Sequence, residues 1–364
     1  MKVKITNGMF VALIMTIIYA KAIGVTQGSL AREIGHDMWI ATILGTLQGI
    51  VMMILTAAIL QKLPDQNFIG FAEALLGKWA GKIVAFVIFL FFLFSFGPIM
   101  VTFIYHFKDY FLPEAPIYLF IVVALIVGIF GGFHGLEVMA RMALVGAFAV
   151  VCLNILLLTG SLSEFDIHNL RPVMEKGFIQ TSWASRHYDT DWALATVMAG
   201  MILPMVKQSE KWVKAGWSGM ILTCIAITMW PILEAAVLSA PVTAEYIVSC
   251  MHLARGAHIG IFLHRYELIM IALFSTSSLI QIMMSLYCSA HALSKIFGVK
   301  DYRPMLIPAG LALGAFGYWL VLDHLRAISF TEKEWPLISL PIAFLLPIIL
   351  WTFGKLFRRK LSRS

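Results

Sequence analysis

The feature that most constrains this chain is the recurrence of apolar runs long enough to cross a bilayer. The chain has 364 residues, of which 60% are hydrophobic and only 13% are charged. A soluble domain carries roughly 25% charged residues, because it must cover its core with groups that water can solvate. Spanning a bilayer takes about 20 apolar residues in a helix, and runs of that kind extend over the whole chain. We therefore predict a membrane protein whose solvent is the lipid bilayer.

Ten such runs are separated by mostly short polar segments. Backbone groups in lipid must hydrogen-bond within the chain. The runs lack the two-residue alternation of barrel strands, so each is predicted to be a helix. We expect residues 1–364 to form one all-α transmembrane domain. The predicted spans are 7–27, 38–61, 81–107, 115–132, 142–160, 191–206, 215–239, 265–296, 303–322 and 335–356.

The distribution of basic residues predicts the orientation. With both termini in the cytoplasm, 17 Lys and Arg residues lie on the cytoplasmic side and nine on the outer side, as the positive-inside rule requires. Five of the 27 basic residues follow Trp351, where they would meet anionic headgroups. The net charge of +7 therefore indicates orientation, and we expect no nucleic-acid partner. Residues Met1 to Ala22 also resemble a cleavable signal peptide, and cleavage would leave the remaining orientation unchanged.

No pattern of reactive or metal-binding side chains points to an enzyme. The four cysteines lie far apart, and the ten histidines include no HExxH pair, so neither metal nor redox spacing is present. The sequence also lacks a P-loop, a G-x-S-x-G turn and kinase-like motifs. We expect no catalytic residue, no cofactor and no bound metal.

Two spans are interrupted by small residues in equivalent places. The first contains Ala20-Lys21-Ala22-Ile23-Gly24, and the sixth contains Thr196 to Gly200 followed by Pro204. Unwound turns at mid-membrane expose main-chain groups to a solute in many transporters, whereas small residues can instead allow close helix packing. Because these spans head two five-span halves, binding is favoured. The predicted ligand contacts are Ala20, Lys21, Ala22, Ile23, Gly24, Val197, Met198, Ala199 and Gly200.

Lys21 is the sharpest single feature of these breaks. A lysine at the bilayer centre costs roughly 2.5–3.5 kcal/mol or more, so it is rarely idle. Three interpretations stay open. Lys21 reaches an interface as a structural residue, contacts a substrate carboxylate or replaces a coupling cation, or takes up and releases a proton.

Further polar residues lie within other spans. Ser275 and Thr276 begin a run of four hydroxyl residues in span eight and are predicted to contact the ligand, unless they bond back to their own helix. Glu234, near the outer end of span seven, is predicted to face an aqueous vestibule or the membrane interface. Glu137 and Arg141 have the spacing of a helical ion pair, and Gly128 and Gly132 that of close helix packing.

Several short segments, in order and spacing, resemble the B subunit of the GerA-type spore-germination receptors, within the amino acid–polyamine–organocation permease superfamily. The resemblance covers nearly the whole chain, and Phe165 to Val173 is its most specific part. The segments are Asp37-Met38-Trp39-Ile40, Leu76-Gly77-Lys78-Trp79, Leu112 to Pro116, Gly135 to Arg141, Phe165-Asp166-Ile167-His168-Asn169-Leu170-Arg171-Pro172-Val173, and Gly260 to Glu267.

This resemblance implies a five-plus-five inverted repeat of the LeuT/APC type with helices one and six broken. It also implies a nutrient germinant receptor of the spore inner membrane, with A and C subunits as partners and small amino-acid-like solutes as ligands. Two departures concern the pocket. Ala20-Lys21-Ala22 replaces a Gly-rich turn, and Thr196 and Met198 align where relatives carry Gly and an acidic residue. The alternative function is a stand-alone proton- or ion-coupled amino-acid transporter, with Lys21 as the coupling group.

Overall fold

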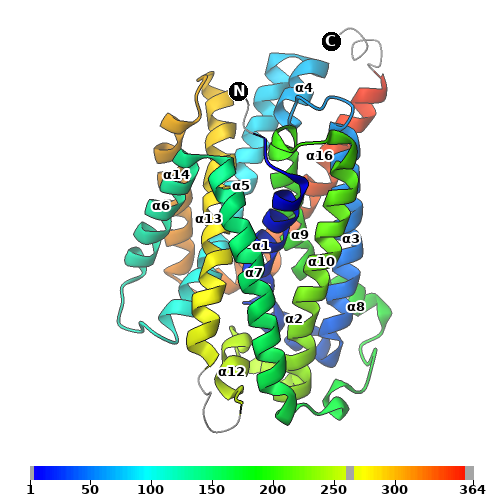
Figure 1. Ribbon diagram of the computed structural model, residues 1–364, viewed down its shortest axis with the longest axis vertical. Helices are drawn as coiled ribbons and strands as arrows, with labels where there is room; N and C mark the ends of the chain where they lie inside the picture. Colours follow the sequence, from blue (N-terminus) through cyan, green and yellow to red (C-terminus); the bar gives the residue numbers. More distant parts are fainter. Residues whose placement is uncertain (1–3, 260–265, 357–364) are drawn as a thin grey trace.

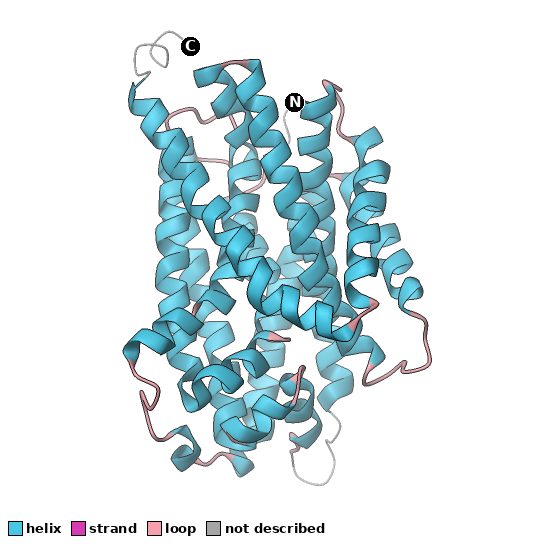
Figure 2. Ribbon diagram, turned by 180° about the vertical axis from the view of Figure 1, so that it is seen from behind, coloured by secondary structure: helices cyan, strands magenta, loops and turns pink. Residues whose placement is uncertain are grey.

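The computed structural model describes residues 4–259 and 266–356, and these form a bundle of helices (Figures 1 and 2). The helices are α1 Asn7–Ala22, α2 Thr26–Ile34, α3 Met38–Leu60, α4 Phe68–Leu76, α5 Lys78–Lys108, α6 Ile117–His134, α7 Leu136–Ser161, α8 Phe178–Ala184, α9 Arg186–Ile202, α10 Trp212–Leu233, α11 Ala240–Glu245, α12 Ser249–Gly256, α13 Tyr266–Phe297, α14 Leu306–Val321, α15 His324–Ser329 and α16 Trp335–Leu356. Two π-helical turns, η6 Glu234–Leu238 and η8 Phe330–Glu334, extend α10 and join α15 to α16.

The prediction of an all-α membrane protein is confirmed. Among the described residues, eight helical stretches are long and apolar enough to span a membrane, and α1 is a shorter apolar helix. The largest difference concerns the first predicted span, which is two helices, α1 and α2, that continue to Ile34. The sixth span begins earlier than predicted, at Arg186, because its first turns bury charged residues that look like loop in the sequence.

Helix α1 runs through the middle of the bundle, between α7, α10 and α13 (Figure 1). Every residue from Ala12 to Ala22 is buried, as expected of a helix enclosed by others rather than lying at a surface. The start of α1 and the end of α16 lie at the same end, which we call the termini end. The short helices α8 and α12 lie towards the opposite end, called the far end (Figure 1).

Small residues set the closest helix contacts. A Cβ added to Gly128 would lie 2.6 Å from Leu286, and one added to Gly132 would lie 2.6 Å from Leu306. The prediction of close packing at these glycines is therefore confirmed, since any larger side chain would separate the helices. The predicted ion pair between Glu137 and Arg141 is also present, at 2.6 Å.

The short helix α4 follows the second span, and its apolar face packs against protein. Phe68 and Phe71 are fully buried. Phe68 lies against Gly200 of α9, where an added Cβ would be 2.0 Å from the ring. This helix therefore closes part of the termini end of the bundle.

Candidate functional site

The candidate site begins at the break in helix one. Helix α1 ends at Ala22, Ile23 to Val25 form a turn, and α2 begins at Thr26. The chain passes close to α5 here, because a Cβ on Gly24 would lie 2.7 Å from Thr102 and 2.9 Å from His106. Gly24 thus permits this close approach, which a side chain would block. Ala20, Lys21 and Ala22 belong to the last turn of α1, while Ile23 and Gly24 lie in the break itself.

Lys21 lies at this break and is buried, with its side chain 4% exposed. Its Nζ is 3.0 Å from Oδ1 of Asp191 and donates a hydrogen bond of 3.0 Å to Oγ1 of Thr190. The interpretation that Lys21 reaches an interface is therefore wrong. The pair joins the broken helix α1 to α9, and Oδ2 of Asp191 has no hydrogen-bond partner among the described residues.

The predicted break in helix six lies elsewhere. Val197, Met198, Ala199 and Gly200 belong to the uninterrupted α9, and the interruption falls at Ser185, between α8 and α9. Gly200 serves close packing against Phe68, which is the alternative that small residues allow. These four residues also lie roughly 9–14 Å beyond Asp191 along the helix, at 1.5 Å per residue.

Sequence reasoning missed the acidic residues of helix six. It aligned Thr196 and Met198 with the positions where relatives carry Gly and an acidic residue, but Thr196 bonds its own helix at Trp192. The carboxylates that face the rest of the bundle are Asp189 and Asp191, which the prediction left in or beside a loop. The sequence did contain a sign of these acidic residues, because Asp189-Thr190-Asp191 directly precedes the apolar run of helix six.

On α13, the fully buried hydroxyls lie two residues later than predicted. Ser275 bonds back to Ile271 of its own helix, and Thr276 packs near Gly146 of α7. Ser277 and Ser278 are instead buried, and their Oγ atoms lack hydrogen-bond partners among the described residues. A few residues further on, Gln281 donates a hydrogen bond of 2.8 Å to the carbonyl of Ile17 in α1.

A buried polar triangle holds the end of α1. Tyr19 donates a hydrogen bond of 2.6 Å to Asn154 of α7. Trp230 of α10 donates to both, at 3.0 Å to the Tyr19 hydroxyl and 3.1 Å to Oδ1 of Asn154. The Asn154 amide also donates to the carbonyl of Ala226, so the network ties the helix turn that carries Lys21 to α7 and α10.

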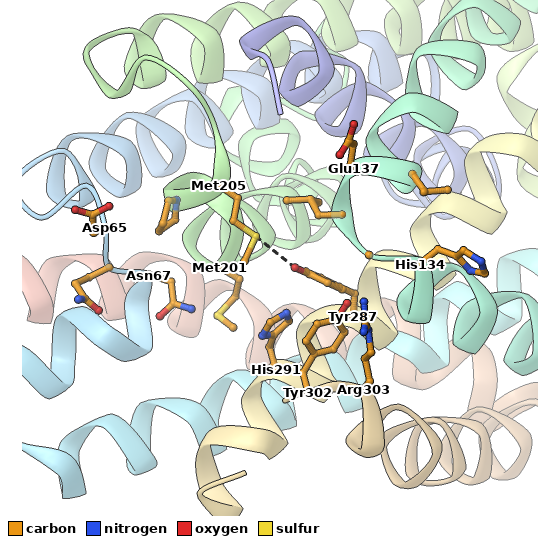
Figure 3. Close-up of a pocket in the computed structure, with 15 residues that line it drawn as sticks. Asp65, Asn67, His134, Glu137, Met201, Met205, Tyr287, His291, Tyr302 and Arg303 are labelled. Carbon is orange, nitrogen blue, oxygen red and sulfur yellow. Dashed lines mark hydrogen bonds between the residues drawn. The ribbon is translucent and has the colours of Figure 1, made fainter. Parts of the chain in front are cut away.

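A cavity of about 500 Å³ opens near the termini end (Figure 3). Met201 and Met205 from the end of α9 face Tyr287 and His291 of α13 across it, and Tyr287 donates a hydrogen bond to Sδ of Met205 at 3.3 Å. Arg303 and Tyr302 add polar groups on the α14 side. The cavity therefore lies on the same side of the Lys21–Asp191 pair as the end of α9.

Charge pairs close the far end. Arg32 of α2 binds Glu332 of η8 at 2.7 Å. Glu33 accepts two hydrogen bonds from Arg186, at 2.8 and 2.9 Å, and lies 3.0 Å from His187. These contacts join α2 to α9 and to the start of α16.

Backbone contacts reinforce this closure. A Cβ on Gly28 would lie 2.3 Å from the carbonyl oxygen of Tyr246, so α2 touches the segment between α11 and α12. The Tyr246 ring stacks on His252 with centroids 3.5 Å apart. Burial lowers the pKa of His252, and the charge of Arg255 lowers it further, which keeps the stacked ring neutral at pH 7.

Glu234 faces neither an aqueous vestibule nor the membrane interface, contrary to the prediction. Its side chain is fully buried, and Oε2 accepts a hydrogen bond of 2.5 Å from Ser249 of α12.

The Phe165 to Val173 segment also contributes to the far end. The Asn169 amide donates to the carbonyl of Ala236, and His36 lies 2.6 Å from the carbonyl of Asn169. The Gly260 to Arg265 part of the last matching segment lies outside the described residues.

Residues 4–317 match the spore permease family, whose members are described as spore germination proteins. The chain belongs to this spore permease family. Similar proteins of Bacillus subtilis (strain 168) include spore germination protein KB, 24% identical over 370 residues, with 93% of this chain and 91% of that protein covered. Spore germination protein A2 is 26% identical, with 89% and 87% covered. The resemblance stated from the sequence is thereby confirmed.

Solved transporter structures share the fold of this spore permease. Mhp1, a nucleobase-cation-symport-1 family transporter in a closed conformation with bromovinylhydantoin bound, superposes with a TM-score of 0.73 at 14% identity, covering 98% of this chain and 80% of that one. MhsT in complex with L-phenylalanine gives 0.62 at 14% identity, covering 97% and 100%. The LeuT/APC-type fold class is confirmed. The chain is a multi-pass membrane protein of a permease family and not an enzyme.

Proposed function

We propose that this spore permease is the B subunit of a nutrient germinant receptor, and that it binds a small amino-acid-type solute where α1 breaks beside α9. The observation that carries the proposal is the buried pair of Lys21 and Asp191 at that break. A charged pair enclosed by a membrane bundle is rarely without function. The A and C subunits would respond to the change in helix arrangement that solute binding causes, and would signal germination.

The chemistry of the pair suits a zwitterion. A buried ion pair loses much of its Coulombic gain to desolvation. An amino acid offers a carboxylate to Nζ of Lys21 and an ammonium group to Asp191, whose Oδ2 has no hydrogen-bond partner among the described residues. Two charge pairs would then replace one, and Thr190 supplies a hydroxyl beside them.

The closed far end and the cavity near the termini end describe one state of a two-state bundle. A ligand shifts such an equilibrium only by its differential affinity for the two states. Because Lys21 is on α1 and Asp191 on α9, a solute that separates the pair would change how these helices meet. That movement is the signal we propose for the partner subunits.

The test is germination of spores that carry the whole receptor with the double substitution Lys21→Met and Asp191→Asn. The double change avoids leaving one buried charge unpaired, which costs about 3–5 kcal/mol. We expect normal protein levels and loss of the amino-acid response. The matched control removes the exposed pair by Glu137→Gln and Arg141→Met, and should respond normally.

An unchanged amino-acid response in the Lys21/Asp191 double variant would contradict the proposed site. Uptake into proteoliposomes tests the receptor role separately. Solute accumulation by the purified chain without A or C subunits would instead identify a stand-alone transporter.

A further inference from the structure

A second buried carboxylate lies outside the proposed ligand site. Asp189 is 2% exposed and is two residues before Asp191, so it points to a different face of α9. It lies against α3, where a Cβ on Gly45 would be 3.0 Å from Oδ1. No described residue forms a hydrogen bond with Oδ1. A carboxylate in this setting needs a cation or a proton.

The cations around it are already engaged. The nearest ones along the chain are Arg186 and His187, which both bind Glu33, and Lys21 of α1 binds Asp191. Arg32 of α2 binds Glu332. Helices α3 and α8 contain no acidic or basic residue, and on α16 only Lys355, near the termini end, is charged. On α13, Lys295 binds Glu73, and His291 lies in the wall of the cavity near the termini end.

The hydrogen bonds of Ser185 distinguish the two forms of the carboxyl group. Its single hydroxyl proton is donated to the carbonyl of Ser182 at 2.8 Å, and one lone pair accepts from Nε2 of Gln48 at 2.8 Å. The same hydroxyl also lies within donor distance of Oδ2 of Asp189, at 3.4 Å. The Ser182 carbonyl is much nearer and is therefore the acceptor to which we assign the proton. An ionised Asp189 would meet a lone pair there, whereas a protonated Asp189 could donate to it.

We propose that Asp189 is a proton-binding site and holds its proton in this closed arrangement. Among the described residues, no group of three or more His, Cys, Asp or Glu side chains could hold a metal ion with Asp189, whereas a proton needs no further ligand. Ser185 is the residue at which α8 ends and α9 begins. The proton therefore stabilises the joint of helix six, and movement of this joint that admits water would release it.

Infrared difference spectroscopy of the ligand-free chain in lipid vesicles tests this directly. The spectrum of the wild type minus that of Asp189→Asn at pH 7 should contain the C=O band of one protonated carboxyl group. Asp65→Asn, at an exposed turn, is the matched control, and its difference spectrum should contain only carboxylate bands. Carboxylate bands for Asp189 itself would overturn the proposal.

If Asp189→Asn does not fold, Ser185→Ala provides the second measurement. Removing the acceptor should shift the protonated-carboxyl band to the frequency of a free acid. No change in that band would overturn the proposal. Because no solute is present in either experiment, failure here leaves the proposed ligand site standing, and the reverse also holds.

Discussion

The two ends of the bundle are built differently. At the far end, α2 is held by ion pairs to Glu332 and Arg186 and by backbone contact with Tyr246. At the termini end, a cavity of about 500 Å³ separates the ends of α9 and α13, and a thioether contact between Tyr287 and Met205 crosses it. Polar contacts also join helices at the termini end, where Lys295 of α13 pairs with Glu73 of α4, but the contact across the cavity itself is between a tyrosine and a methionine. Opening the far end therefore requires breaking the ion pairs and the backbone contact of α2, whereas the walls of the cavity can adjust by side-chain movement.

Gly28→Ala should have the largest effect, because its Cβ would overlap the backbone carbonyl of Tyr246 at 2.3 Å. Overpacking of this kind costs about 1–3 kcal/mol, and rigid backbone places it at the upper end. We expect α2 and the α11–α12 segment to separate. Alkylation of Cys250, which is fully buried on α12, should accelerate. Gly256→Ala, with open space around it, is the control, and equal rates in the two variants would show that Gly28 does not close the far end.

Gly200→Ala should act at the termini end by pushing Phe68 away from α9. A side chain can move more readily than backbone, so we expect about 1–2 kcal/mol of destabilisation, measured by thermal unfolding. Cys250 should stay protected. Adding Phe68→Leu should recover part of the loss, and an additive double variant would contradict this contact.

Glu33→Gln removes the acceptor shared by Arg186 and His187. These side chains are only partly exposed, so we expect the substitution to lower the free energy of opening the far end by about 1 kcal/mol. Alkylation of Cys250 should then be about fivefold faster. Ligand-free protein in vesicles suffices for the measurement. Unaltered protection of Cys250 would place the closure in the backbone contact alone.

Arg32→Gln should have the smallest effect of the series, about 0.5–1 kcal/mol, because its ion pair with Glu332 is partly solvated. Salt screens such a pair. The difference in Cys250 alkylation between wild type and variant should therefore shrink in 1 M salt. A difference that does not change with salt would indicate a packing role for Arg32 instead.

The fold was largely predictable because long apolar runs mark their own boundaries. The helices Met38–Leu60 and Trp335–Leu356 agree with the predicted spans to within a residue. The break in helix one was also predictable, since Gly24 follows a charged residue inside an apolar run. The position of the break in helix six was not predictable. A glycine such as Gly200 gives the same sequence pattern whether it lies in an unwound turn or makes room for a neighbouring side chain, here Phe68.

The partner of Lys21 could not be found by span counting. Asp189 and Asp191 lower the local hydropathy, so span six was predicted to begin only at Asp191, and Asp189 was left in the preceding loop. Burial of a charge depends on its partner, and the partner here is distant in sequence. The same holds for Glu234, whose bond to Ser249 depends on how α12 folds back. A search for intramembrane charges of opposite sign, rather than for apolar runs, would have paired Lys21 with this acidic segment.

The central claim is that Lys21 and Asp191 form the solute site, and equilibrium binding of a panel of L-amino acids to the purified chain in nanodiscs tests it most directly. We expect the wild type and the Glu137→Gln/Arg141→Met variant to bind the same amino acid with equal affinity. The Lys21→Met/Asp191→Asn variant should bind it at least 100-fold more weakly, since each lost charge-assisted bond is worth about 1.5–3 kcal/mol. Equal affinity in all three proteins would contradict the account.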